Sequence, residues 1–193
     1  IMIFGNHDKC KESNEILKKY FYTYHNKITN QEENLLNGLT VQESLILNYK
    51  KKDILLIHGH QGDFLNDNLW KFSRFLVRYI WKNLEFIGIK DPTSAAKNNR
   101  VTKKTEKRLK KWSNKHNKII IAGHTHRAIY PKAGESMYFN DGSCVHPDGI
   151  TCIEIEKGYI TLVRWLLKVR EDNTIFVEKE IIEGPLPLIN FFK

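Results

Sequence analysis

The order of apolar and polar positions along the chain predicts a mixed α/β fold. Short apolar runs of the length expected for buried strands occur at residues 1–4, 45–47, 54–57, 118–122, 137–139, 151–155, 159–165 and 174–182. Polar triplets at Glu156-Lys157-Gly158 and Glu171-Asp172-Asn173 predict hairpin turns between the last three runs. Pro185 and Pro187 predict a loose tail after them.

Helical spacing appears in three segments, at residues 12–24, 67–84 and 97–115. The first should bury the side made by Ile16, Leu17, Tyr20, Phe21 and Tyr24. The second is rich in aromatic residues, namely Trp70, Phe72, Phe75, Tyr79 and Trp81. The third carries Val101, Leu109 and Trp112 at helical spacing within an otherwise basic segment.

Length and charge narrow the class of protein. A chain of 193 residues with 41% hydrophobic and 27% charged residues fits one globular domain, not a disordered or fibrous chain. The net charge of +9 is confined to residues 97–118, which hold ten basic residues and one acidic residue. The basicity therefore belongs to one element, which favours a local contact with an anion over a generally basic, nucleic-acid-binding surface.

Three cysteines, Cys10, Cys144 and Cys152, are too few for a disulfide framework and form no Cys-x-x-Cys pair. We expect them to be reduced and partly buried in a cytoplasmic protein. No apolar run approaches the ~20 residues of a membrane span, and the first residues have no signal-peptide pattern.

Three of the predicted strands end in clusters of Gly, His, Asn and Asp. These clusters are Gly5-Asn6-His7-Asp8, His58-Gly59-His60 and Gly123-His124-Thr125-His126, and they contain five of the eight histidines. Ligand sites gather at the carboxyl ends of strands in open sheets, and histidine is the commonest metal-binding side chain. Each of the first two clusters alone is typical of a turn, but the three together favour a metal site.

In their order along the chain, these clusters resemble the third, fourth and fifth motifs of the calcineurin-like metallophosphoesterases. Phe139-Asn140-Asp141-Gly142-Ser143 resembles the Asn-x-Gly-Ser turn that often follows, so the resemblance covers residues 1–165. It implies a four-layer α/β/β/α sandwich with two metal ions and phosphoesterase activity. The family's first two motifs would precede residue 5, and we therefore expect an N-terminally truncated domain.

The resemblance also implies roles for individual residues. Asn6, His58 and His124 would bind one metal ion and His126 the other, while His7, oriented by Asp8, would act as general acid or stabilise charge. Two divalent ions ~4 Å apart can hold a phosphoryl group and activate a water molecule. The mixed nitrogen and oxygen donors favour Mn, with Fe, Zn or Mg as alternatives.

Two further residues near the motifs are candidates for substrate binding. Arg127 follows the last histidine pair, with a surface salt bridge as the alternative. His60 follows His58 closely, with a place on a solvated loop as the favoured alternative, which also holds for Asp63.

The chain is interpreted as one partial domain, 1–193, with a helical cap insert at 64–116. Its layout is similar to the UDP-2,3-diacylglucosamine hydrolase branch of the family, whose cap admits a lipid-bearing nucleotide. The expected activity is metal-dependent hydrolysis of a phosphodiester, pyrophosphate or phosphomonoester, by a cytoplasmic protein with peripheral contact to an anionic membrane. The alternatives are a non-catalytic relative that binds protein partners and a basic nucleic-acid-binding protein.

Overall fold

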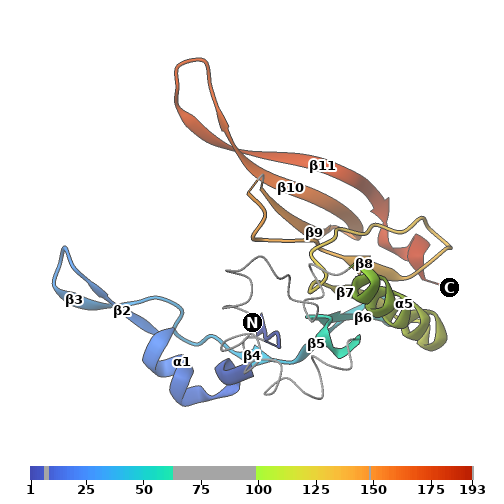
Figure 1. The fold of residues 1–193 in the computed structure, drawn as a ribbon, viewed down its shortest axis with the longest axis horizontal. Helices are drawn as coiled ribbons and strands as arrows, with labels where there is room; N and C mark the ends of the chain where they lie inside the picture. Colours follow the sequence, from blue (N-terminus) through green and yellow to red (C-terminus); the bar gives the residue numbers. More distant parts are fainter. Residues whose placement is uncertain (7–8, 63–98, 148, 193) are drawn as a thin grey trace, which may run out of the picture.

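A computed structural model describes residues 1–6, 9–62, 99–147 and 149–192 of the chain (Figure 1). The aromatic segment predicted to be helical at 67–84 lies outside these residues, as do His7, Asp8 and Asp63. Of the predicted cap insert, only its last part is described.

The N-terminal segment begins with β1 (Met2–Ile3), which pairs in parallel with β4 (Val41–Gln42). The predicted strand at residues 1–4 is confirmed, but its burial holds only for Phe4, directly after β1, because Ile1 is exposed and Met2 and Ile3 are partly buried. A 3-10 turn, η1 (Lys9–Glu12), leads from this strand towards the first helix.

The first helix, α1 (Asn14–Tyr20), is shorter than predicted. The hairpin of β2 (Thr23–Asn26) and β3 (Gln31–Asn34) follows it, and the sequence analysis missed this hairpin. Leu17 is the buried residue of α1, whereas Tyr20 and Tyr24 are exposed. The predicted apolar side was wrong at these two tyrosines, because the chain turns at Phe21 and the helical spacing does not continue.

The central sheet has four strands in the order β5-β6-β7-β8. These are β5 (Ser44–Tyr49), β6 (Lys52–Ile57), β7 (Ile119–Ala122) and β8 (Tyr138–Asn140). β5 and β6 form an antiparallel hairpin, whereas β6, β7 and β8 run parallel. The three parallel strands therefore end at the same edge of the sheet.

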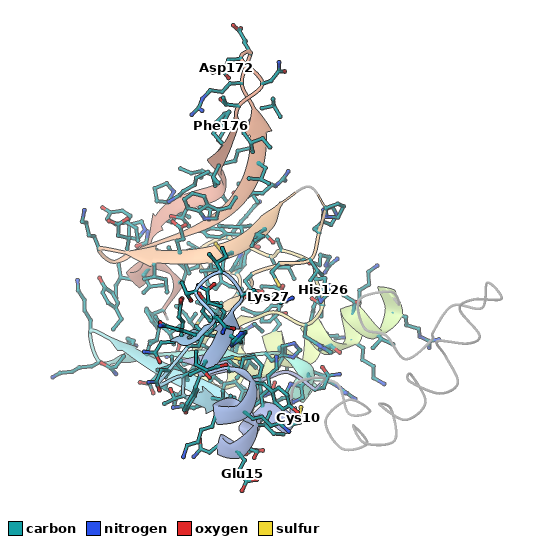
Figure 2. All side chains as sticks on the ribbon, turned by 90° about the vertical axis from the view of Figure 1, so that its left-hand side faces the viewer. Cys10, Glu15, Lys27, His126, Asp172 and Phe176 are labelled. Carbon is teal, nitrogen blue, oxygen red and sulfur yellow. The ribbon has the colours of Figure 1, made fainter. Side chains whose placement is uncertain are left out.

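A second, antiparallel sheet contains β9 (Ile150–Glu156), β10 (Tyr159–Val169) and β11 (Ile175–Pro187). Both predicted hairpin turns are confirmed. β10 and β11 extend beyond β9 as a two-stranded ribbon, and Figure 2 shows Asp172 and Phe176 near its tip, far from His126.

The predicted loose tail was wrong. Pro185 and Pro187 lie within the last part of β11, and the chain then forms the 3-10 turn η4 (Leu188–Phe191). Leu188 and Phe191 are fully buried in the core. The prolines are accommodated because β11 is an edge strand, where an absent backbone N–H breaks few ladder bonds.

The main core lies between the two sheets. It contains apolar side chains from β6, β7 and β8 on one side and from β10 and η4 on the other: Ile54, Ile119, Ile121, Met137, Phe139, Ile160, Leu188 and Phe191. Alternate residues of β7, Ile120 and Ala122, face the opposite side of the sheet. There they pack against Leu109 of the basic helix α5 (Asn99–His116).

The helix α5 confirms the predicted helical segment at 97–115. Its buried stripe is largely polar and consists of Thr102, Thr105, Glu106, Leu109 and Ser113. Trp112 was predicted from its spacing to lie with Leu109, but it is 40% exposed and stacks on His116. The last part of the predicted cap insert thus packs as a helix on the outer face of the central sheet.

The three cysteines are free, as expected. Cys10 and Cys144 are exposed, so the expectation of partial burial holds only for Cys152. Figure 2 shows Cys10 at the end of the molecule that carries α1. No helix in the described part is both long and apolar enough to cross a membrane.

The start of β9 provides a test of the packing between strands. Gly149 has a φ of +137°, and a Cβ at this position would lie 2.6 Å from the backbone oxygen of Trp165. Gly134 has a φ of +83°, and a Cβ there would meet no atom within 4 Å. We expect Gly149→Ala to lower the free energy of unfolding by about 3 kcal/mol and Gly134→Ala by about 1 kcal/mol. Urea denaturation measures both, and equal losses would contradict the role of the Trp165 contact.

Candidate metal centre at the strand ends

Two of the predicted motifs, those of His58 and His124, lie at the carboxyl ends of the parallel strands β6 and β7. Ile57 of β6 is paired with Ala122 of β7, so His58 and Gly123 leave the sheet side by side. The Gly123 N–H donates to the His58 carbonyl at 3.0 Å, and the Asp141 N–H donates to the Ala122 carbonyl at 3.0 Å. The backbone thus brings three separate loops to one point.

Glycine permits the close approach of two of these loops. Gly59 has a φ of +106°, and a Cβ there would lie 3.2 Å from the Gly123 oxygen and 3.3 Å from the His124 Cβ. On the other side of His58, a Cβ on Gly5 would lie 2.7 Å from its Nε2 atom. Gly5 therefore places the first predicted motif, which includes the buried Asn6, against His58 of the second motif.

Three histidine rings form a cluster at this point. The His58 ring centroid lies 5.0 Å from that of His124 and 5.3 Å from that of His60, and the His60 and His124 centroids are 6.5 Å apart. His60 begins the 3-10 turn η2 (His60–Gly62) and is only 2% exposed. The favoured alternative of a solvated loop was therefore wrong for His60.

His126, the predicted ligand of the second metal ion, is placed differently. Its side chain is exposed, and Figure 2 shows it beside α5. Over the described ranges, no three His, Cys, Asp or Glu side chains converge closely enough to hold a metal ion. The donor types nevertheless suit a transition metal, because imidazole nitrogens and amide oxygens are ordinary ligands of Mn, Fe and Zn.

Arg127 forms a salt bridge, which was the alternative to its predicted role in substrate binding. Its guanidinium binds Glu106 of α5 through two nitrogens, with Nε at 3.0 Å from Oε1 and Nη2 on Oε2. The Glu106 carboxylate is buried and also accepts a 3.3 Å hydrogen bond from the Thr125 hydroxyl. The loop that carries His124 and His126 is thereby fastened to α5.

Asn140 holds the same loop from the opposite side, a role that was not predicted from the sequence. Its fully buried amide nitrogen lies 2.8 Å from the Gly123 oxygen, 3.1 Å from the Thr125 hydroxyl and 3.1 Å from the Tyr138 hydroxyl. Its amide oxygen accepts the Gly142 N–H at 2.9 Å. Burial raises the pKa of Tyr138 to about 12, so this phenol stays protonated.

Asp141 is a second residue of the site that was not predicted from the sequence. It lines a cavity of about 450 Å³ between the two sheets, together with His58, Gly123 and a largely apolar wall. Burial raises its pKa to about 6 from the ordinary 3.8. The sequence held one signal for this role: Asp141 directly follows a buried strand, as His58 and the Gly123-His124 pair also do.

A family profile, the calcineurin-like phosphoesterase superfamily domain, matches residues 1–157. The chain belongs to the calcineurin-like phosphoesterase superfamily. This confirms the resemblance seen in the motifs and the α/β class that it implied. Among the layers expected for the family, the described residues form both sheets and the outer helix α5.

Several solved structures are similar to this chain. Vps29 from Chaetomium thermophilum shares 13% identity with a TM-score of 0.34, over 74% of this chain and 59% of its own. A predicted phosphoesterase from Streptococcus pneumoniae shares 17% identity with a TM-score of 0.32, over 72% of this chain and 62% of its own. Vps29 from Entamoeba histolytica, complexed with zinc, shares 17% identity with a TM-score of 0.29, over 75% of this chain and 63% of its own.

The chain spans less than two thirds of the length of these solved structures. No curated protein matched it in sequence. The superfamily is therefore established by the profile match.

The Arg127–Glu106 pair gives the first prediction for the site. Arg127→Ala leaves the buried Glu106 carboxylate without its guanidinium partner, and we expect a loss of about 2 kcal/mol in unfolding free energy. This is below the range for fully buried pairs because the Arg127 side chain is 53% exposed. Lys104→Ala, on the exposed side of α5, is the control and should change stability by less than about 0.5 kcal/mol. Urea unfolding that gives equal values for both variants would contradict the structural role of this pair.

The raised pKa of Asp141 gives a prediction on pH. The folded chain holds this proton up to about pH 6, whereas the unfolded chain releases it near 3.8. The free energy of unfolding therefore falls as pH rises from about 4 to above 6. The contribution of Asp141 to this loss is about 2–3 kcal/mol at most. In EDTA, Asp141→Asn should remove this part of the decline, so that the variant is more stable than the parent at pH 7.

Asp172→Asn at the hairpin tip is the matched control, because hydrogen bonds from Thr174 lower the pKa of Asp172. This variant should leave the decline between pH 4 and 6 in place. Thermal unfolding at a series of pH values measures the difference between each variant and the parent. If the stability of Asp141→Asn declines with pH as steeply as that of the parent, another group causes the decline.

Proposed function

We propose that the chain is a phosphoesterase that hydrolyses a phosphodiester, pyrophosphate or phosphomonoester with a dinuclear metal centre. One observation carries the proposal: His58 and His124 leave adjacent parallel strands of a calcineurin-like phosphoesterase domain with their rings 5.0 Å apart. Gly5 lies directly against His58, which brings the Asn6 loop to the same place. Three motifs distant in sequence thus meet at one edge of the sheet.

Asn6, His58 and His124 would hold one metal ion, and His126 the other. Such a pair of ions would supply an activated water molecule and neutralise charge on the phosphoryl group. Mn is the proposed metal, with Fe, Zn or Mg as alternatives that suit the same donors. The exposed side chain of His126 is reachable from solvent in this arrangement.

The remaining site residues would position these ligands. His60 is buried against His58, so we propose that it fixes the orientation of the His58 ring instead of binding substrate. Arg127, occupied by Glu106, would keep the His124–His126 loop in place and offer its remaining N–H groups to a phosphate. The proposed roles of His7 as general acid and Asp8 as its orienting partner concern residues outside the described ranges.

The proposal also covers the substrate class and the cellular location. We propose a small phosphorylated substrate, of the nucleotide- or lipid-linked kind handled by the UDP-2,3-diacylglucosamine hydrolase branch. A cytoplasmic protein in peripheral contact with an anionic membrane would fit such a substrate, and nucleic acid is the less favoured partner. The exposed basic residues of α5 support the anionic character of the partner.

The activity is tested with bis(p-nitrophenyl) phosphate and Mn²⁺, by the release of p-nitrophenolate. We expect hydrolysis by the full chain and a loss of about 100-fold or more in His124→Ala, since a metal ligand is removed. His116→Ala, an exposed histidine on α5, is the matched control and should retain full activity. A folded chain that neither binds Mn²⁺ in calorimetry nor hydrolyses the ester would contradict the proposal and favour a non-catalytic role.

A further inference from the structure

A cleft of about 490 Å³ lies between α5 and the loop that follows β7. It is separate from the cavity beside Asp141, and five basic side chains line it: Lys103, Lys107, Lys110, Arg127 and Lys132. Glu106 and Glu135 are its acidic residues, and Ile129, Tyr130, Pro131 and Tyr138 provide apolar surface. A volume of this size is in the range of small-molecule sites.

The charges of this cleft are not balanced. Glu106 is neutralised by Arg127, which leaves four lysines against Glu135. Within the described part of the chain, no ion pair joins any of these four lysines to a carboxylate. Neighbouring like charges repel each other, so an anion that enters the cleft relieves this repulsion as well as gaining its own contacts.

The spacing of the lysines indicates the size of the anion. Lys103, Lys107 and Lys110 follow one another at intervals of four and three residues, so they lie on one face of α5. Lys103 and Lys110 are about 10 Å apart along the helix axis at 1.5 Å per residue. A chain of two or three phosphates is long enough to contact all three lysines of this row at the same time.

The geometry points to a binding site for a ligand with two or more phosphate groups. We propose that the lysine row of α5 and Lys132 bind its phosphates, with the apolar wall beside Tyr130 against the rest of the ligand. The cleft shares the loop of residues 123–127 with the histidine cluster through the Glu106–Arg127 and Glu106–Thr125 contacts. The inference concerns binding and holds whether or not the histidine cluster catalyses hydrolysis.

The test compares two triple variants that remove the same charge. The cleft variant carries Lys103→Gln, Lys107→Gln and Lys110→Gln, which remove the charges of the lysine row. The control variant carries Lys104→Gln, Lys111→Gln and Lys115→Gln, which remove three exposed charges of α5 outside the cleft. Calorimetry with inorganic tripolyphosphate should show binding by the parent, weakened about tenfold or more in the cleft variant and within about twofold in the control. Circular dichroism melts establish that both variants are folded.

A second arm separates a soluble ligand from a lipid headgroup. Phosphatidylcholine vesicles containing phosphatidic acid are sedimented with each protein at about 150 mM salt, where diffuse attraction is screened. If tripolyphosphate binding but no vesicle binding is lost in the cleft variant, the ligand is soluble. If vesicle binding is lost there as well, and not in the control, the site also accepts phosphates at a membrane surface. Equal losses in both variants, or no binding in either arm, would overturn the proposal.

Discussion

The buried amide of Asn140 is the constraint on which the site depends. It holds the Gly123 carbonyl and the Thr125 hydroxyl from one side while its own oxygen binds the Gly142 N–H. The loop needs such support, because His124 and His126 have φ values of +66° and +53°, a region that costs non-glycine residues about 1–2 kcal/mol each. Strained histidines that persist in a folded chain are a common mark of a functional loop.

The same loop is held from the helix side by a buried carboxylate. Glu106 accepts hydrogen bonds from Thr125 and Arg127, so the helix α5 and the edge of the sheet are joined by charge as well as by the apolar contact of Leu109. This arrangement explains the polar buried stripe of α5. The inner face of the helix fastens the histidine loop, and Lys103, Lys107 and Lys110 beside it line the cleft.

Pattern and spacing predicted the local elements well where an apolar run was continuous or a helical face was strongly marked. The pattern at 119–122 predicted a buried strand, and the basic segment predicted α5. The hairpin of β2 and β3 was missed because its strands are mostly polar and because Tyr24 of β2 continues the helical spacing of the preceding segment. The Pro185–Pro187 segment was misinterpreted because proline is tolerated at a sheet edge, and only the neighbouring strands reveal an edge.

The sequence by itself indicated that the loops carrying Asn6, His58 and His124 belong to one site, because polar clusters that follow buried strands are typical of ligand sites. It also localised the whole excess of positive charge to residues 97–118. Only the tertiary structure decided that His60 is buried against His58, that Asp141 enters the cavity, and that Arg127 pairs with Glu106. These facts depend on contacts between elements distant in the chain, which spacing along a single strand or helix does not encode.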